Sequence, residues 1–164
     1  MNFLRLKTHS PEQTQLLGNY LGKLAQRGDI FLLVGALGTG KTCLVQGMAH
    51  GLSTKEYAFS PSFVIVREYH GRLPLYHVDF YRLDHIEEIT DLGLEEYSYR
   101  NGVCVVEWAE KGLQVLPRNN LLITLNYVSN YETQRSISLK PEGERYLELI
   151  KQLESALNKE ISWS

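Results

Sequence analysis

The sequence predicts a three-layer α/β fold, with helices covering a mainly parallel central sheet that also carries antiparallel hairpin strands. Residues 30–34 form a continuous apolar run, which is typical of a strand buried on both faces. Residues 103–106 form a second apolar strand that Glu107 closes. Helical patterns alternate with such strands along the chain, and this alternation indicates an α/β architecture.

The first predicted helix begins after Ser10, a good capping residue, with Pro11 in the first turn and Gln13 where a capping box needs it. Apolar residues then recur at helical spacing to Leu24, and Gly28 is predicted to end the helix. The remaining expected elements are a helix over 41–50, paired strands over 62–69 and 75–81, helices over 86–91 and 94–99, hairpin strands over 121–128 and 134–139, and a C-terminal amphipathic helix carrying Tyr146, Leu147, Ile150, Leu153 and Leu157.

Length and composition bound the kind of protein. A chain of 164 residues predicts a single domain over 1–164, and 43% hydrophobic with 22% charged residues excludes disorder. No secretory signal or membrane-length apolar run is visible, and Cys43 and Cys104 have no partner spacing. We therefore expect a cytoplasmic protein without membrane contact. The net charge of -2 argues against strong unaided binding to nucleic acid.

A glycine-rich loop follows the first apolar strand. Residues 35–42 read Gly-Ala-Leu-Gly-Thr-Gly-Lys-Thr, which matches the phosphate-loop pattern. Backbone N–H groups and the start of the next helix would bind phosphate oxygens, Lys41 would reach the β- and γ-phosphates, and the Thr42 hydroxyl would ligate magnesium. The expected ATP- or ADP-binding residues are Gly35, Gly38, Thr39, Gly40, Lys41, Thr42 and Cys43, although Cys43 also suits a small packing role. The alternative is a plain turn between a core strand and a helix.

Two acidic residues end predicted strands and are candidates for the magnesium and catalytic site. Asp79 follows residues 75–78 and Glu107 follows residues 103–106. A carboxylate there can hold the metal or orient an attacking water, whereas the alternative is a solvated or turn-capping acid. Which of the two lies nearer the metal stays open.

Three other sets of residues are candidates for nucleotide, partner or metal binding. Ser60, Pro61, Ser62 and Phe63 follow the loop and its helix at a distance that suits a nucleotide-sensing switch, or else a turn before a strand. Arg135 lies in a hairpin strand, where a solvated side chain is expected and a phosphate or partner contact is the alternative. The five histidines show no zinc spacing, and His77 is interpreted as a packed or hydrogen-bonded strand residue.

Together, the phosphate loop, the Ser-Pro-Ser-Phe segment, Tyr76-His77-Val78-Asp79-Phe80-Tyr81-Arg82 and Val106-Glu107-Trp108 resemble the TsaE (YjeE) family. These are small bacterial ATPases, with a P-loop NTPase fold, that are needed to form threonylcarbamoyladenosine on tRNA. The resemblance extends from residue 10 to about residue 139. It implies ATP phosphates on residues 38–42 with Mg²⁺ on Thr42, Glu107 as second metal ligand with a part in hydrolysis, and Asp79 as the strand-end acid near the metal.

The same resemblance implies that residues 60–63 are a mobile switch and that Trp108 packs beside the nucleotide. Ser62 stands where the family usually has Thr, so the hydroxyl is kept and a methyl group is lost. The implied partners are TsaD and TsaB, which carry out threonylcarbamoyl transfer, with tRNA reached indirectly through that complex. The ATP cycle would reset or regulate the assembly. The alternatives are a small-molecule kinase and a nucleotide-dependent binding module without significant hydrolysis.

Overall fold

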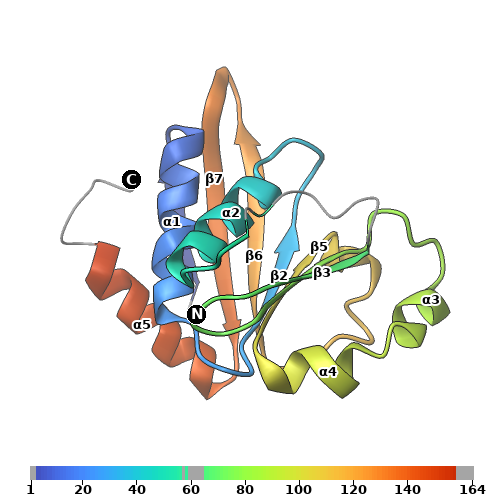
Figure 1. The fold of residues 1–164 in the computed structure, drawn as a ribbon. Coiled ribbons are helices and arrows are strands. Elements are labelled where there is room, and N and C mark those ends of the chain that lie inside the picture. The colour runs from blue at the N-terminus through green and yellow to red at the C-terminus, as the bar shows by residue number, and fades with distance from the viewer. Residues whose placement is uncertain (1–2, 57, 59–64, 158–164) are drawn as a thin grey trace.

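The buried apolar strands lie side by side at the centre of one seven-stranded sheet (Figure 1). The computed structural model describes residues 3–56, 58 and 65–157. The strand order is β1-β7-β6-β2-β5-β4-β3. β2 pairs in parallel with β5 and β6, and β4 with β5, whereas β1, β3 and β7 join by antiparallel pairing. The predicted fold class is thereby confirmed.

The described elements follow the predicted order, with a first strand and a 3₁₀ turn in addition. They are β1 (Leu4–Thr8), α1 (Pro11–Leu24), β2 (Ile30–Val34), α2 (Lys41–Gly51), β3 (Val66–Tyr69), β4 (Leu75–Asp79), α3 (Ile86–Asp91), α4 (Leu94–Asn101), β5 (Val103–Glu107), a 3₁₀ turn η1 (Ala109–Lys111), β6 (Asn120–Val128), β7 (Tyr131–Glu142) and α5 (Glu144–Leu157).

Alternate residues of the central strands feed two separate cores, one on each face of the sheet. Phe31 and Leu33 of β2 pack in the core shared with α1, α2 and α5. Ile30 and Leu32 face the opposite core, which includes residues of α3 and α4. Two-sided burial explains why these strands read as continuous apolar runs, and it confirms the expected three layers.

Helices α1 and α2 pack against each other through glycines (Figure 1). A Cβ atom at Gly18 would lie 2.1 Å from the Leu44 carbonyl oxygen, and one at Gly47 would lie 2.0 Å from the Gln15 carbonyl oxygen. No side chain fits at either point, so the two backbones touch directly. This contact fixes the axis of α2, whose first residue is Lys41.

Several predicted boundaries differ from the structure. α1 ends at Leu24, before Gly28, because the backbone of Ala25 is extended, and Arg72 and Arg145 donate to carbonyls of the last turn and to the Ala25 carbonyl. β4 ends at Asp79, two residues earlier than expected. β1 was not predicted, since only Leu4 and Leu6 alternate in so short a segment; both pack against the core beside β7.

The described part of the chain contains no helix with both the length and the apolar character that a membrane crossing requires.

Candidate functional site

The glycine-rich loop connects β2 to α2, as the phosphate-loop pattern requires. Gly38 and Gly40 have φ angles of 80° and 103°, in the left-handed region that favours glycine. Gly40 occupies the N-cap position of α2 and provides no side chain to cap it. No side chain therefore caps the first N–H groups of α2. They remain available to an anion, which the positive end of the helix dipole also favours.

Lys41 is a buried cation at the first position of α2. Its Nζ atom donates to the carbonyl oxygens of Gly35 at 2.5 Å and Ala36 at 3.0 Å, and the same atom lies over the Trp108 ring. Burial lowers the pKa of Lys41, while the negative charge of Glu107 acts in the opposite direction. The ammonium group thus lies inside the loop, balanced by carbonyl dipoles and carboxylates.

Glu107 is the last residue of β5, and its side chain contacts the first turn of α2. The Thr42 hydroxyl donates to the Glu107 carboxylate, with Oγ1 lying 3.1 Å from each carboxylate oxygen. Glu107 is 3% exposed, and its Oε2 atom also lies 2.5 Å from Nε2 of His77. The hydroxyl and carboxylate predicted to share a metal ion are therefore in direct contact.

Asp79 lies directly beside Glu107 in the sheet, because the two residues are register partners in the parallel pair of β4 and β5. Its Oδ1 atom accepts a hydrogen bond from the Tyr81 backbone N–H at 2.8 Å. Burial raises the pKa of Asp79, the Glu107 charge adds to this, and the Tyr81 hydrogen bond opposes it. The two predicted strand-end acids meet at one edge of the sheet, as expected for parallel strands.

A cavity of about 290 Å³ lies between these groups. Its lining combines loop, helix and strand-end residues: Leu37, Gly38, Gly40, Lys41, Thr42, Cys43, Asp79, Tyr81, Glu107 and Trp108. Of the predicted residues, Gly35 and Thr39 do not line it, and the Thr39 hydroxyl instead donates to the Ala36 carbonyl oxygen. Leu37 and Tyr81 are lining residues that sequence reasoning missed.

Trp108 follows Glu107 and has a φ angle of 58°, which is unusual for a bulky residue. Its ring lies 5.0 Å from the Tyr81 ring, centroid to centroid. Such strained conformations persist only where the surroundings hold them, and they are common at functional sites. The turn places the indole ring at the cavity, and its position beside a nucleotide stays a prediction.

The β6–β7 hairpin holds the outer side of the loop. Arg135 donates to the Thr39 carbonyl oxygen at 3.1 Å and to that of Gly38 at 3.3 Å. The Tyr127 hydroxyl donates to the Leu37 carbonyl oxygen, and the Arg135 guanidinium lies 4.7 Å from the Tyr127 ring centroid. The expectation that Arg135 is solvated was wrong, because the loop lies over this face of the hairpin. Because the loop and the hairpin are far apart in the sequence, no local sequence pattern indicates this contact.

The predicted switch, Ser60, Pro61, Ser62 and Phe63, lies outside the described residues. Within the described part of the chain, no group of three or more His, Cys, Asp or Glu side chains is arranged to hold a metal ion. One hydroxyl and one or two carboxylates suit Mg²⁺ only together with phosphate oxygens and water, which is the usual way this ion binds.

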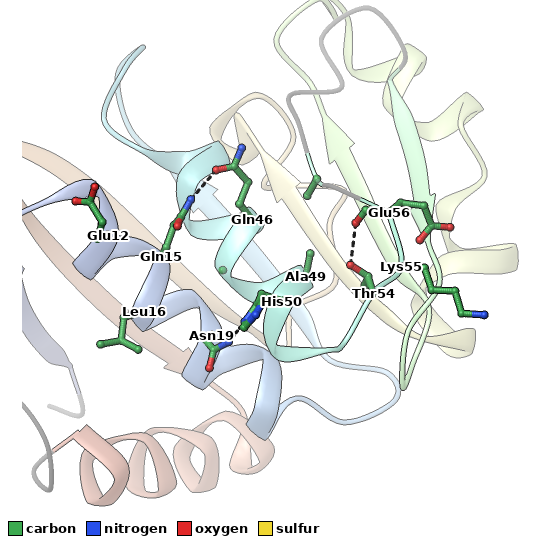
Figure 2. Close-up of a pocket in the computed structure, with 12 residues that line it drawn as sticks. Glu12, Gln15, Leu16, Asn19, Gln46, Ala49, His50, Thr54, Lys55 and Glu56 are labelled. Atoms are coloured by element: carbon green, nitrogen blue, oxygen red, sulfur yellow. Dashed lines mark hydrogen bonds between the residues drawn. The ribbon is translucent and has the colours of Figure 1, made fainter.

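A larger cavity, of about 570 Å³, lies along α1, α2 and the segment after α2 (Figure 2). Its polar side chains are largely bonded to one another: Gln15 to Gln46 at 2.9 Å, and Asn19 to His50 at 2.5 Å. Figure 2 also shows the Thr54 hydroxyl bonded to the Glu56 carbonyl oxygen. This cavity contains neither the glycine-rich loop nor the strand-end acids, so it is not the candidate site.

A glycine-rich loop between a parallel strand and a helix, facing carboxylates on neighbouring strands, is the arrangement of the phosphate-loop class of α/β proteins. The chain belongs to the TsaE family, since the family model described as "Threonylcarbamoyl adenosine biosynthesis protein TsaE" matches residues 8–137. The resemblance found in the sequence is thus confirmed.

Individual relatives agree with this assignment. A tRNA threonylcarbamoyladenosine biosynthesis protein TsaE from Treponema pallidum is 41% identical over 77% of this chain and 94% of its own length. The protein of the same name from Bacillus subtilis is 40% identical over 93% of this chain and 95% of its own length. The crystal structure of Bacillus subtilis YdiB matches with a TM-score of 0.82 and 35% identity, covering 95% of this chain and 97% of that one.

Proposed function

We propose that this protein is the ATP-binding and ATP-hydrolysing component of the bacterial machinery that forms threonylcarbamoyladenosine on tRNA. In this role it regulates or resets a TsaD–TsaB transferase, which performs the threonylcarbamoyl transfer itself. The family membership and the printed names of the relatives support the pathway. The role places the protein in the cytoplasm and brings it to tRNA only through its partners, in keeping with a net charge of -2.

One observation carries the ATPase part of the proposal: the Thr42 hydroxyl lies 3.1 Å from both carboxylate oxygens of Glu107, at the N-terminus of α2. These are oxygen donors of the kind that Mg²⁺ prefers. They lie beside a helix end that favours phosphate. A glycine-rich turn without a ligand-binding role would need neither a buried carboxylate nor a lysine inside the loop.

In this proposal, some residues of the site bind the phosphates and others hold the metal ion and orient water. Backbone N–H groups of the loop and of α2 bind the phosphates, and Lys41 leaves the Gly35 and Ala36 carbonyls to reach the β- and γ-phosphates. Thr42 and Glu107 hold Mg²⁺, and Asp79 lies next to Glu107 to orient water around it. The metal ion supplies neutralisation of charge on the phosphate oxygens. The cavity volume of about 290 Å³ is near the roughly 300 Å³ lower limit for small-molecule sites, so it would take the phosphates and the metal ion, and the nucleoside would extend beyond it.

The two alternatives differ in what they require. A small-molecule kinase generally needs an acceptor site and cationic groups around the transferred phosphoryl group. Among the described residues that line the cavity, Lys41 is the only cationic side chain, which disfavours a kinase. A binding module without significant hydrolysis has the same loop, and only measured turnover separates it from an ATPase.

Phosphate release and ADP binding by the wild type and by Lys41→Ala test the proposal. The variant should lose most nucleotide affinity or turnover, because it lacks the cation that faces the β- and γ-phosphates. Circular dichroism controls for folding, since Lys41 is also buried. Hydrolysis by the variant at the wild-type rate would contradict the phosphate-loop interpretation.

The partner part needs its own experiment. We expect the isolated protein to hydrolyse ATP slowly, because no arginine lines the described cavity; an arginine supplied in trans raises turnover by about 10³–10⁵-fold in related enzymes. Capture of a TsaD–TsaB pair is measured with ATP, with ADP and without nucleotide, alongside phosphate release. Binding that ignores the nucleotide, with no stimulation, would favour the passive binding module.

A further inference from the structure

His77 is completely buried next to the candidate site, and each of its ring nitrogens has a polar neighbour. Its side chain is 0% exposed. Nε2 lies 2.5 Å from Oε2 of Glu107, and Nδ1 lies 3.4 Å from the Tyr69 hydroxyl oxygen. The imidazole therefore bridges β3 and the carboxylate at the end of β5.

Strand periodicity explains how His77 reaches Glu107. His77 and Asp79 are two residues apart on β4, so they lie on the same face of the sheet. The neighbouring strand β5 presents Val105 and Glu107 to that face, with Val105 the register partner of His77. Glu107 is therefore diagonal to His77 across the two strands. Its carboxylate contacts both the imidazole and the Thr42 hydroxyl.

The partners assign the direction of each hydrogen bond. A carboxylate can only accept, so Nε2 of His77 carries the proton and donates to Glu107. In the neutral imidazole Nδ1 is then an acceptor, and the Tyr69 hydroxyl can donate to it. Glu107 thus receives two donors, His77 from the sheet and Thr42 from α2. Two donors from two elements fix the carboxylate in one rotamer.

We propose that His77 is a positioning residue, which holds the Glu107 carboxylate against Thr42 so that both oxygens are placed for metal and water. This inference rests on the proposed function of Glu107 but concerns a different residue. A Thr42 hydroxyl that ligated a metal ion would do so through an oxygen lone pair and could keep donating its proton to Glu107, so His77 and Thr42 would hold the carboxylate together. A packed histidine without this role would leave Glu107 free to change rotamer.

Substitutions that separate donation from packing test the proposal. His77→Leu removes the donor and keeps an apolar side chain in the core, whereas His77→Gln keeps an N–H group that reaches towards Glu107. Loss of a hydrogen bond to a metal-ligating group typically costs 10–100-fold in metal affinity or activity. We expect His77→Leu to lower both the Mg²⁺ enhancement of ADP binding and single-turnover ATP hydrolysis within that range, and His77→Gln to restore most of each.

Val78→Ala is the matched control for stability. Val78 is the next residue of β4, is fully buried and belongs to the opposite core. Its substitution should lower the melting temperature without changing ADP binding in Mg²⁺ or the rate per folded molecule. If Val78→Ala reduces hydrolysis as much as His77→Leu at similar stability, the positioning role is wrong.

A third measurement does not depend on hydrolysis. The ¹⁵N NMR spectrum of the His77 ring, recorded on the wild type without nucleotide, should show a protonated Nε2. An unprotonated Nε2 would overturn the proposal, and so would a His77→Leu variant with wild-type Mg²⁺ dependence. If the wild type itself neither binds ATP nor hydrolyses it, the proposed function fails, while the NMR result still decides whether His77 donates to Glu107.

Discussion

The Lys41 ammonium nitrogen lies 4.3 Å from the centroid of the Trp108 ring, close enough for a cation–π interaction. The same nitrogen donates to the carbonyl oxygens of Gly35 and Ala36. A phosphate that draws Lys41 into the cavity must therefore separate it from the loop carbonyls and change its relation to the indole ring. Binding at the loop and the environment of Trp108 are coupled through one side chain.

This coupling predicts a change in tryptophan fluorescence when ADP or ATP is added. The signal should arise from Trp108, because its ring contacts Lys41 and lines the cavity. Titration of Trp108→Phe should show no change, whereas Trp163→Phe should retain the wild-type change. A nucleotide-dependent signal that survives in Trp108→Phe and disappears in Trp163→Phe would contradict this placement.

Arg135 should matter for nucleotide affinity although its side chain does not line the cavity. It holds the carbonyl groups of Gly38 and Thr39, and therefore the orientation of the loop's peptide groups. Hydrogen bonds from charged groups contribute roughly 1.5–3 kcal/mol, and loss of the lower end of this range from the loop in Arg135→Ala should weaken ADP binding by about tenfold. Lys140→Ala, an exposed cation on the same strand, is the control for charge. Equal affinities for the wild type and Arg135→Ala would show that the loop is stable without this contact.

The ion pair between Arg145 and Asp29 should stabilise the fold without affecting the site. Arg145 Nη2 lies 2.6 Å from Oδ2 of Asp29, whose side chain is 3% exposed, and the pair joins α5 to the start of β2. Asp29→Ala should lower the free energy of unfolding by about 3 kcal/mol, because it breaks a buried pair. Glu142→Ala breaks an exposed pair with Lys140 and should change stability by less than about 0.5 kcal/mol. Urea denaturation measures both, and similar values for the two variants would contradict the assignment.

The contact between His70 and Glu56 should depend on pH. Their side-chain hydrogen bond, 2.7 Å from Nδ1 to Oε1, raises the pKa of His70 above 6.5 and lowers the pKa of Glu56 from 4.5 to about 2. The contribution to stability is therefore complete between pH 4.5 and 6.5. It is lost as the pH rises through the folded pKa of His70, or falls towards that of Glu56.

NMR titration of the His70 ring measures this directly. The wild type should give a pKa above 6.5, and Glu56→Gln should bring it back towards the ordinary value. Glu68, 3.9 Å from Nε2 of His70, keeps a smaller influence in both proteins. An unshifted His70 in the wild type would show that the two side chains do not pair in solution.

Local patterns were sufficient to predict the central strands and the loop. The run at β2 is apolar because both faces are buried, and the glycines at 38 and 40 are needed by the backbone angles found there. The strand-end position of Asp79 and Glu107 placed them at one edge, since parallel strands end on the same side. These inferences required only strand periodicity and the direction of the chain.

Contacts between distant segments were beyond local patterns. Arg135 lies 96 residues from Thr39 in sequence, and only the sheet order brings its hairpin beside the loop. The bond between His77 and Glu107 joins diagonal neighbours on β4 and β5, a contact that requires both the strand order and the register. The glycine contact of α1 with α2 was also missed. Glycines within a helical pattern indicate a lower helix propensity, but they do not reveal which segment packs against them.

Comparison of ATP hydrolysis and ADP binding in Glu107→Gln is the most direct test of the central claim, that the Thr42–Glu107 edge of the cavity performs hydrolysis. The substitution keeps the size of the side chain and removes its charge. Single-turnover hydrolysis should fall by roughly 100-fold, because a neutral amide holds Mg²⁺ less well than a carboxylate and charge stabilisation by the metal is worth several kcal/mol. ADP affinity measured without Mg²⁺ should change little, because the loop backbone still binds the diphosphate. Hydrolysis at the wild-type rate, or an equal loss of hydrolysis and ADP affinity, would contradict the account.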